Sequence, residues 1–117
     1  MPKNSEIKLY VQLDDNRVPD KIEWEAGDAG FTGKKEANSM MLSVWDKEEK
    51  VTLGIDLWTK DMMVDDMNIH VHQVFLKIAD TYRKATKNSE AADMIEHFAA
   101  DFADKLELKK KVIKNSE

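Results

Sequence analysis

The sequence predicts an α+β protein in which a four-stranded antiparallel sheet is followed by two C-terminal helices packed on one face, as a two-layer sandwich. Two observations predict this fold. Apolar and polar residues alternate through the first half of the 117-residue chain, as in half-buried strands. From about residue 61 the apolar residues instead recur with the period of an amphipathic helix. Antiparallel strands followed by helices with short connections typically form two layers around one core.

The alternation places the four strands in order. In the first, Ile7, Leu9, Val11 and Leu13 alternate with polar or aromatic neighbours. The segment 27–38 contains three glycines and several charges, so we interpret it as a loop. The charged residues 46–50 suit the turn of a hairpin between the last two strands. The predicted strands cover about residues 6–14, 21–26, 40–46 and 51–59.

Two amphipathic helices follow the strands. The first, at about 63–87, carries an apolar stripe that includes Val71, Phe75 and Ile78. Asn88 and Ser89 form a cap signal for the second helix, at about 89–108. We therefore expect a single domain over residues 1–108 and a charged tail over 109–117.

The bulk composition excludes several classes of function. A net charge of −5 argues against a nucleic-acid-binding protein, which needs a basic face to neutralise phosphates. The absence of cysteine excludes a disulfide framework, thiolate metal sites and a cysteine nucleophile. The N-terminal residues lack the apolar run of a signal peptide, and no segment has the roughly 20 apolar residues of a membrane-spanning helix. We expect a cytoplasmic protein that does not insert into membranes.

Residues 55–72 contain four aspartates and two histidines, which raises the question of a metal or acid–base site. If a helix begins near Val64, His70 and His72 point in opposite directions and cannot share an ion. A site built on Asp66, His70 and His97 would need the polar flanks of both helices to meet. Acidic residues in a first helical turn instead stabilise unpaired N–H groups and the helix dipole. We therefore predict no catalytic, metal-binding or cofactor-binding residues, and no enzymatic activity.

Apolar residues also occupy faces that should contact water. Trp58 lies opposite the core row of its strand, Trp45 ends a strand that is apolar on both sides, and Tyr10 lies on the polar side of the first strand. Such residues can be scattered on any surface. Contiguous apolar patches, however, usually mark interfaces, where aromatic residues and methionine are enriched. The candidate interaction surface comprises Tyr10, Trp45, Trp58, Ile69 and Leu76.

The chain resembles the gliding motility protein family GldC of the Bacteroidota over roughly residues 5–108. Its most specific element is the run Asp56-Leu57-Trp58-Thr59-Lys60-Asp61-Met62. Further matching runs are Ser5–Lys8, Leu13–Trp24, Met40–Asp46, Val64–Met67, His72-Gln73 and Ala79–Tyr82. The sequence departs from the family pattern at Met63, where we expect proline, and at Ile69–Val71, which is less aromatic.

The resemblance implies a non-enzymatic accessory protein of gliding motility that supports the gliding and type IX secretion machinery, with no known cofactor. Its partner would be a protein of that machinery, or a second copy of the chain in a homo-oligomer. The order of strands and helices also resembles the export chaperone SecB. The alternative is therefore a small chaperone-like module, or one that binds an apolar ligand at the same surface.

Overall fold

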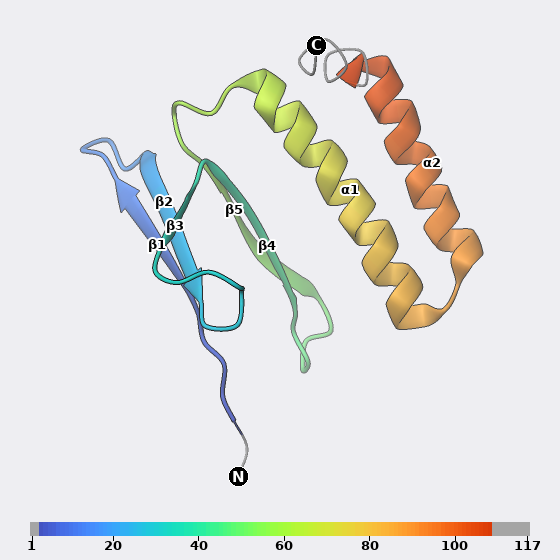
Figure 1. Ribbon diagram of the computed structural model, residues 1–117, viewed down its shortest axis with the longest axis horizontal. Helices are drawn as coiled ribbons and strands as arrows, with labels where there is room; N and C mark the ends of the chain where they lie inside the picture. The colour runs from blue at the N-terminus through green and yellow to red at the C-terminus, as the bar shows by residue number, and fades with distance from the viewer. Residues whose placement is uncertain (1–2, 109–117) are drawn as a thin grey trace. The chain divides into compact units, whose positions relative to one another are not determined.

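A computed structural model describes residues 3–108, which form two compact units, one ending at Met62 and one beginning at Met63. The first unit contains five strands and the second contains two helices (Figure 1). The α+β class, the antiparallel strands and the two helices are therefore confirmed. The packing of the helices on one face of a sheet stays a prediction, and the predicted charged tail at 109–117 lies outside the described residues.

The first sheet has the strand order β1-β2-β3. Strand β1 (Ile7–Leu13) pairs antiparallel with β2 (Pro19–Ala26), with Val11 opposite Ile22 and Leu9 opposite Trp24. Strand β3 (Lys35–Ala37) adds to the other side of β2, with Ala37 opposite Ile22. Because Ile22 has neighbours on both sides, its side chain is only 1% exposed and forms the centre of this sheet.

The second sheet is the hairpin of β4 (Ser39–Trp45) and β5 (Thr52–Trp58). Its turn is fixed by Asp46, which accepts hydrogen bonds from the backbone N–H groups of Glu49 and Lys50. Lys50 takes the left-handed conformation that closes the turn (φ 56°). The charged segment 46–50 is therefore the hairpin turn that the sequence predicted.

The prediction of a single four-stranded sheet was wrong, because the strands form one sheet of three and one of two. The strand predicted at 40–46 is preceded by β3, which lies in the segment that we interpreted as a loop. Extending the register of β2 and β3 would put Ser39 opposite Asp20 and Met41 opposite Val18. However, β2 begins at Pro19, directly after a turn in which Asp14 accepts the N–H groups of Asn16 and Val18. There is thus no residue of β2 before Pro19 with which β4 could pair, and β4 pairs with β5 alone.

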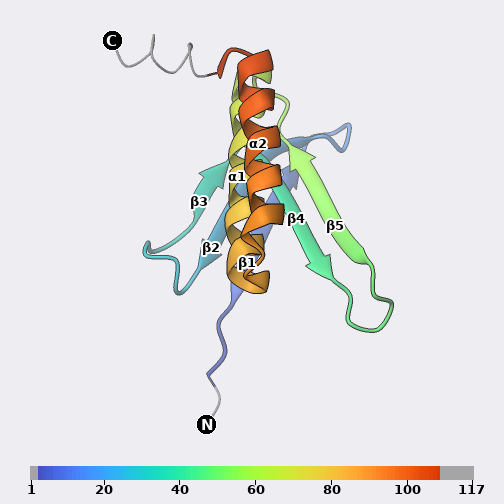
Figure 2. The ribbon, with the colours of Figure 1, turned by 90° about the vertical axis from the view of Figure 1, so that its right-hand side faces the viewer.

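A polar junction joins the two sheets where they separate. Thr59 is buried, and its N–H donates to the carbonyl of Asn38 (2.8 Å). The Thr59 hydroxyl donates to Asp61 (2.5 Å), and the Asn38 amide donates to the oxygens of Thr59 (3.1 Å) and Asp61 (3.3 Å). Lys60 binds Asp14 in the β1–β2 turn (3.0 Å). Figure 2 shows the two sheets diverging from each other.

The second unit is a hairpin of α1 (Val64–Thr86) and α2 (Ser89–Lys105). Alanines at the interface are buried and allow the helices to approach closely: Ala79, Ala92, Ala99 and Ala103. Phe75 makes edge-to-face contacts with Phe98 (5.2 Å) and Phe102 (5.4 Å). The Asn88 side chain accepts the N–H of Ala91, so the predicted cap of the second helix is confirmed.

Candidate interaction surface

The β4–β5 hairpin has two chemically different faces, set by the register of its strands. On one face three aliphatic pairs lie directly opposite each other: Met40 and Leu57, Leu42 and Ile55, and Val44 and Leu53. We call this the aliphatic face. Four of its side chains are exposed, namely Leu42, Val44, Leu53 and Ile55. A six-residue aliphatic face of this kind requires cover from water, which the hairpin by itself does not provide.

The opposite face carries Met41, Trp45 and Trp58, and we call it the tryptophan face. Trp58 pairs with Ser39 at the base of the hairpin and is 58% exposed, whereas Trp45 pairs with Thr52 near the turn and is 65% exposed. Two pairs lie between the two indoles along this face, Met41 with Asp56 and Ser43 with Gly54. The face therefore presents an aromatic group at each end, with a methionine, an acidic residue and two small residues between them.

Gly54 maintains the close approach of the two strands. A Cβ added at this position would lie 2.4 Å from the backbone oxygen of Leu42, so any side chain would push the strands apart. The glycine thus serves the hairpin backbone, and its place on the tryptophan face is a consequence of the register. The sequence had shown this residue on the same side as Trp58 without indicating why glycine is needed.

Tyr10 has partners of its own in the three-stranded sheet. Its hydroxyl donates to Glu25 (2.6 Å), and the Lys34 ammonium lies 4.0 Å from the centre of its ring. The hydrogen bond to Glu25 and partial desolvation raise the pKa of the Tyr10 hydroxyl above its ordinary value. These contacts are those of a half-buried structural tyrosine.

The five predicted surface residues thus lie in three places. Trp45 and Trp58 share the tryptophan face, and Tyr10 lies on a different sheet. Ile69 and Leu76 belong to α1, where Ile69 is half-buried and Leu76 is exposed. Of the five, the two tryptophans lie on one face of the hairpin, at its opposite ends. Alternation along β4 places Met41 on the same side as Trp45, and the register adds Trp58 to that side.

The acidic and histidine-rich stretch is divided between separate roles. Asp56 lies on β5, Asp61 belongs to the polar junction, and Asp65 and Asp66 lie in the first turn of α1. His70 is half-buried, and within the described residues its Nε2 atom has no hydrogen-bond partner. Among residues 3–108, no group of three or more His, Asp or Glu side chains is arranged to hold a metal ion. The helix begins at Val64, where the sequence placed it.

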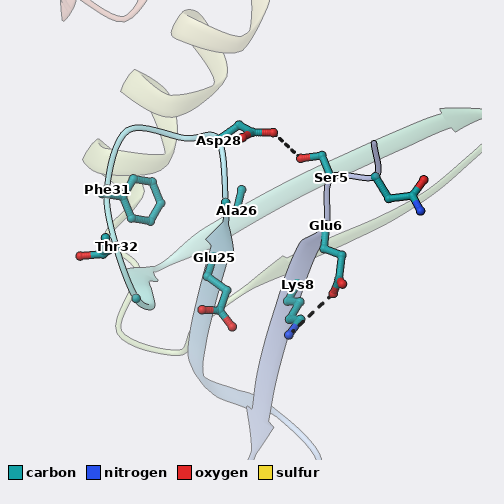
Figure 3. Close-up of a pocket in the computed structure, with 11 residues that line it drawn as sticks. Ser5, Glu6, Lys8, Glu25, Ala26, Asp28, Phe31 and Thr32 are labelled. Carbon is teal, nitrogen blue, oxygen red and sulfur yellow. Dashed lines mark hydrogen bonds and ion pairs between the residues drawn. The ribbon is translucent and has the colours of Figure 1, made fainter. Parts of the chain in front are cut away.

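An open hollow of about 460 Å³ lies beside the start of β1 and the loop after β2. Figure 3 shows its lining, in which Ser5 donates to Asp28 (2.6 Å) and Lys8 pairs with Glu6 (3.7 Å). The carboxylate of Glu25 and the ring of Phe31 complete the wall. These groups satisfy one another or face water, as expected of a solvated surface depression.

Comparison with known proteins decides the family. The family model described as gliding motility-associated protein GldC-like matches residues 19–108, from the start of β2 through both helices. The chain belongs to the GldC-like family. The match includes Asp56–Met62, the run that carried the resemblance most specifically. No curated protein and no solved structure is significantly similar to the chain. Neither helix, within the part of the chain that the structure describes, is long and apolar enough to cross a membrane.

Proposed function

We propose that this member of the GldC-like family is a non-enzymatic, cytoplasmic accessory protein that binds a protein of the gliding and type IX secretion machinery and supports its assembly or stability. The observation that carries the proposal is the two-faced hairpin. A sheet that packs in its own core needs one apolar face, yet β4–β5 has an aliphatic face and, behind it, the exposed indoles of Trp45 and Trp58. The tryptophan face therefore exceeds what folding requires.

The chemistry of the tryptophan face suits a protein partner. Tryptophan and methionine are enriched at the centres of interfaces, because they bury a large area at low cost in conformational entropy. Ser43, Thr52 and Asp56 lie among them and offer hydrogen bonds that fix orientation. Gly54 has no side chain, which allows the backbone of a partner to approach at that position, beside Ser43.

The proposal is tested by purifying the tagged full chain from gliding cells after cross-linking. The wild-type chain should retain a component of the gliding machinery at fixed stoichiometry. Trp45→Ser combined with Trp58→Ser should reduce its recovery at least tenfold, since central aromatic contacts carry about 2 kcal/mol or more each. Met94→Ser is the matched control, because Met94 is an exposed apolar residue on α2. Equal recovery with both variants would contradict the assignment of the tryptophan face.

A chaperone-like function, with unfolded clients or an apolar small molecule at the same hairpin, is the second candidate. The exposed aliphatic residues Val44, Leu53 and Ile55 favour it, because they could accept varied apolar segments. This function predicts that the protein suppresses aggregation of unrelated unfolded proteins without fixed stoichiometry. A single machinery component bound at a constant ratio, with no effect on unrelated clients, would rule it out.

A further inference from the structure

Within residues 3–108, no strand pairs with the outer edge of β5, and the hydrogen bonds of the hairpin determine which of its backbone groups point outward. Asp46 N–H donates to the carbonyl of Val51, and Thr59 N–H donates to that of Asn38 (2.9 and 2.8 Å). These bonds flank the β4–β5 ladder at its two ends and share its register. In an antiparallel ladder, hydrogen-bonded pairs alternate with pairs whose N–H and C=O groups point away from the partner strand. The odd-numbered residues of β5 therefore bond to β4, and the N–H and C=O groups of Thr52, Gly54, Asp56 and Trp58 point outward.

The edges of the three-stranded sheet carry features that oppose pairing. Strand β1 has Lys8 on it and an irregular register between Gln12 and Leu13, and β3 has three residues, including Lys35. Lysines, irregularities and short length are the common ways in which edge strands are blocked. The start of β4 lies near the three-stranded sheet, since Met40 and Ile22 line the same small hollow of about 140 Å³.

Strand β5 lacks these protections. Its seven residues contain no Lys, Arg or Pro, and its register with β4 is regular. In Figure 2, β5 lies beyond β4 from β2 and β3 over most of its length, and its C-terminal end contacts the start of β2, where the N–H of Lys60 donates to the carbonyl of Pro19 (3.3 Å). The sheet to which it belongs has two strands, and an isolated two-stranded sheet is marginally stable, whereas more strands with a shared apolar face stabilise one another.

We propose that a second copy of the chain adds along β5, antiparallel and centred on Ile55, so that two hairpins form one four-stranded sheet with β5 strands in the middle. In this register each Leu53 lies opposite Leu57 of the second copy, and the two Ile55 side chains meet. The outward groups of Gly54 meet those of Asp56, and those of Thr52 meet those of Trp58. All seven residues of each β5 are paired, and the aliphatic faces of both hairpins join.

Charge favours this register over its neighbour. The one charged residue of β5, Asp56, faces Gly54 of the second copy. A register centred on Asp56 would place the two carboxylates directly opposite each other, and like charges in that position destabilise a sheet. The register centred on Ile55 also sets Trp58 beside Thr52 of the second copy, which is itself paired with Trp45. The tryptophan faces then form one surface.

Site-specific disulfides test the register, since the chain contains no other cysteine. Ile55 would be a non-hydrogen-bonded pair across the twofold axis, where Cα atoms about 4.5 Å apart suit a disulfide. The full chain with Ile55→Cys should form a cross-linked dimer under mild oxidation. Leu53→Cys is the control, because Leu53 lies on the same strand and face with a similar exposure, 48% against 53% for Ile55. Equal cross-linking of both, or preferential cross-linking of Leu53→Cys, would overturn the proposal.

Backbone pairing is tested without disulfides by Asp56→Pro. Proline removes the outward N–H of Asp56 and leaves the ladder to β4 intact, because the N–H of this residue does not point to β4. Asp56→Asn keeps the N–H and removes the charge. By sedimentation velocity at up to about 100 µM, the wild type and Asp56→Asn should sediment at twice the 13.5 kDa mass of the chain. Asp56→Pro should sediment as a monomer with unchanged circular dichroism. A monomeric wild type, or a dimeric Asp56→Pro, would overturn the proposal.

This self-association is independent of the proposed motility partner. A chain that dimerises through β5 but captures no machinery component would contradict the proposed function and leave the dimer standing. A monomeric chain that captures the component through Trp45 and Trp58 would do the reverse.

Discussion

The sheet β1–β3 and the hairpin β4–β5 use strands of similar length and the same alternation of side chains, yet they differ in what they bury. Ile22 has strand neighbours on both sides and is almost fully buried, whereas its counterpart in the hairpin, Ile55, has one neighbouring strand and is 53% exposed. Burial in a sheet thus depends on the number of neighbouring strands as much as on the pattern of the sequence.

The two regions also differ in which side chains they leave exposed. In the three-stranded sheet, Ile22 is buried and Tyr10 contacts Glu25 and Lys34, whereas the aliphatic row of β1 is 37–72% exposed. In the hairpin, apolar residues are exposed on both faces. The comparison predicts that substitutions in the first sheet act mainly on folding, and that those in the hairpin act mainly on association.

Truncation of the two isoleucines tests this difference most directly. Ile22→Ala should lower the free energy of unfolding by about 3 kcal/mol, because a buried side chain loses both its transfer energy and its packing. Ile55→Ala should cost about 1 kcal/mol in a dilute, monomeric sample, because half of that side chain already contacts water. Urea denaturation of both variants measures the difference. Equal losses would show that the hairpin is as much a part of the core as the first sheet.

An added methyl group at Gly54 tests whether the close approach of β4 and β5 stabilises the hairpin. Gly54→Ala should cost about 2 kcal/mol, because its Cβ would clash with the carbonyl of Leu42 and the strands must move apart. Gly27→Ala is the control, since no atom lies within 4 Å of its added Cβ, and it should change stability by less than about 0.5 kcal/mol. Hydrogen exchange should show lost protection in β4 and β5 of Gly54→Ala, with β1 and β2 unchanged. Uniform loss through both sheets would contradict the local effect.

Elements with strong periodicity were predictable from the sequence. The alternation in β1, β4 and β5 and the caps around α2 depend on neighbouring residues, so the sequence carries them directly. The division into two sheets was not predictable, since it depends on where β2 begins in space relative to β4. Strand β3 was not predicted either. Lys35–Ala37 has no alternation of its own, and it is a strand because it pairs with β2.

The candidate surface was predictable in its residue types more than in its grouping. The sequence identified Trp45 and Trp58 as apolar residues on wet faces, and the register shows that they share one face with Met41. The sequence could not show that the Tyr10 hydroxyl donates to Glu25, because that hydrogen bond joins residues on different strands. Alternation within one strand assigns a face, whereas grouping across strands requires the register.

The ion pair of Lys60 and Asp14 also links the two regions, and its effect should depend on pH. The backbone N–H of Val18 and the Lys60 ammonium lower the pKa of the Asp14 carboxyl below its ordinary 3.8, so its contribution to stability is complete above that value and is lost as pH falls through the lower, folded pKa. The hydrogen bond to Asp14 raises the pKa of Lys60 above 10.5, so the contribution of the ammonium is lost only as pH rises through that higher value. Lys60→Met should therefore be slightly less stable than the wild type at neutral pH, and this difference should shrink as the solution is acidified through the lowered pKa of Asp14, because the carboxyl then becomes protonated. The same difference should also diminish in high salt, because both groups face water and are screened.

Lys77→Met, on an exposed position of α1, is the control and should show neither dependence. A difference between Lys60→Met and the wild type that persisted unchanged at low pH would mean that Lys60 joins the sheets by packing of its alkyl chain rather than by its charge.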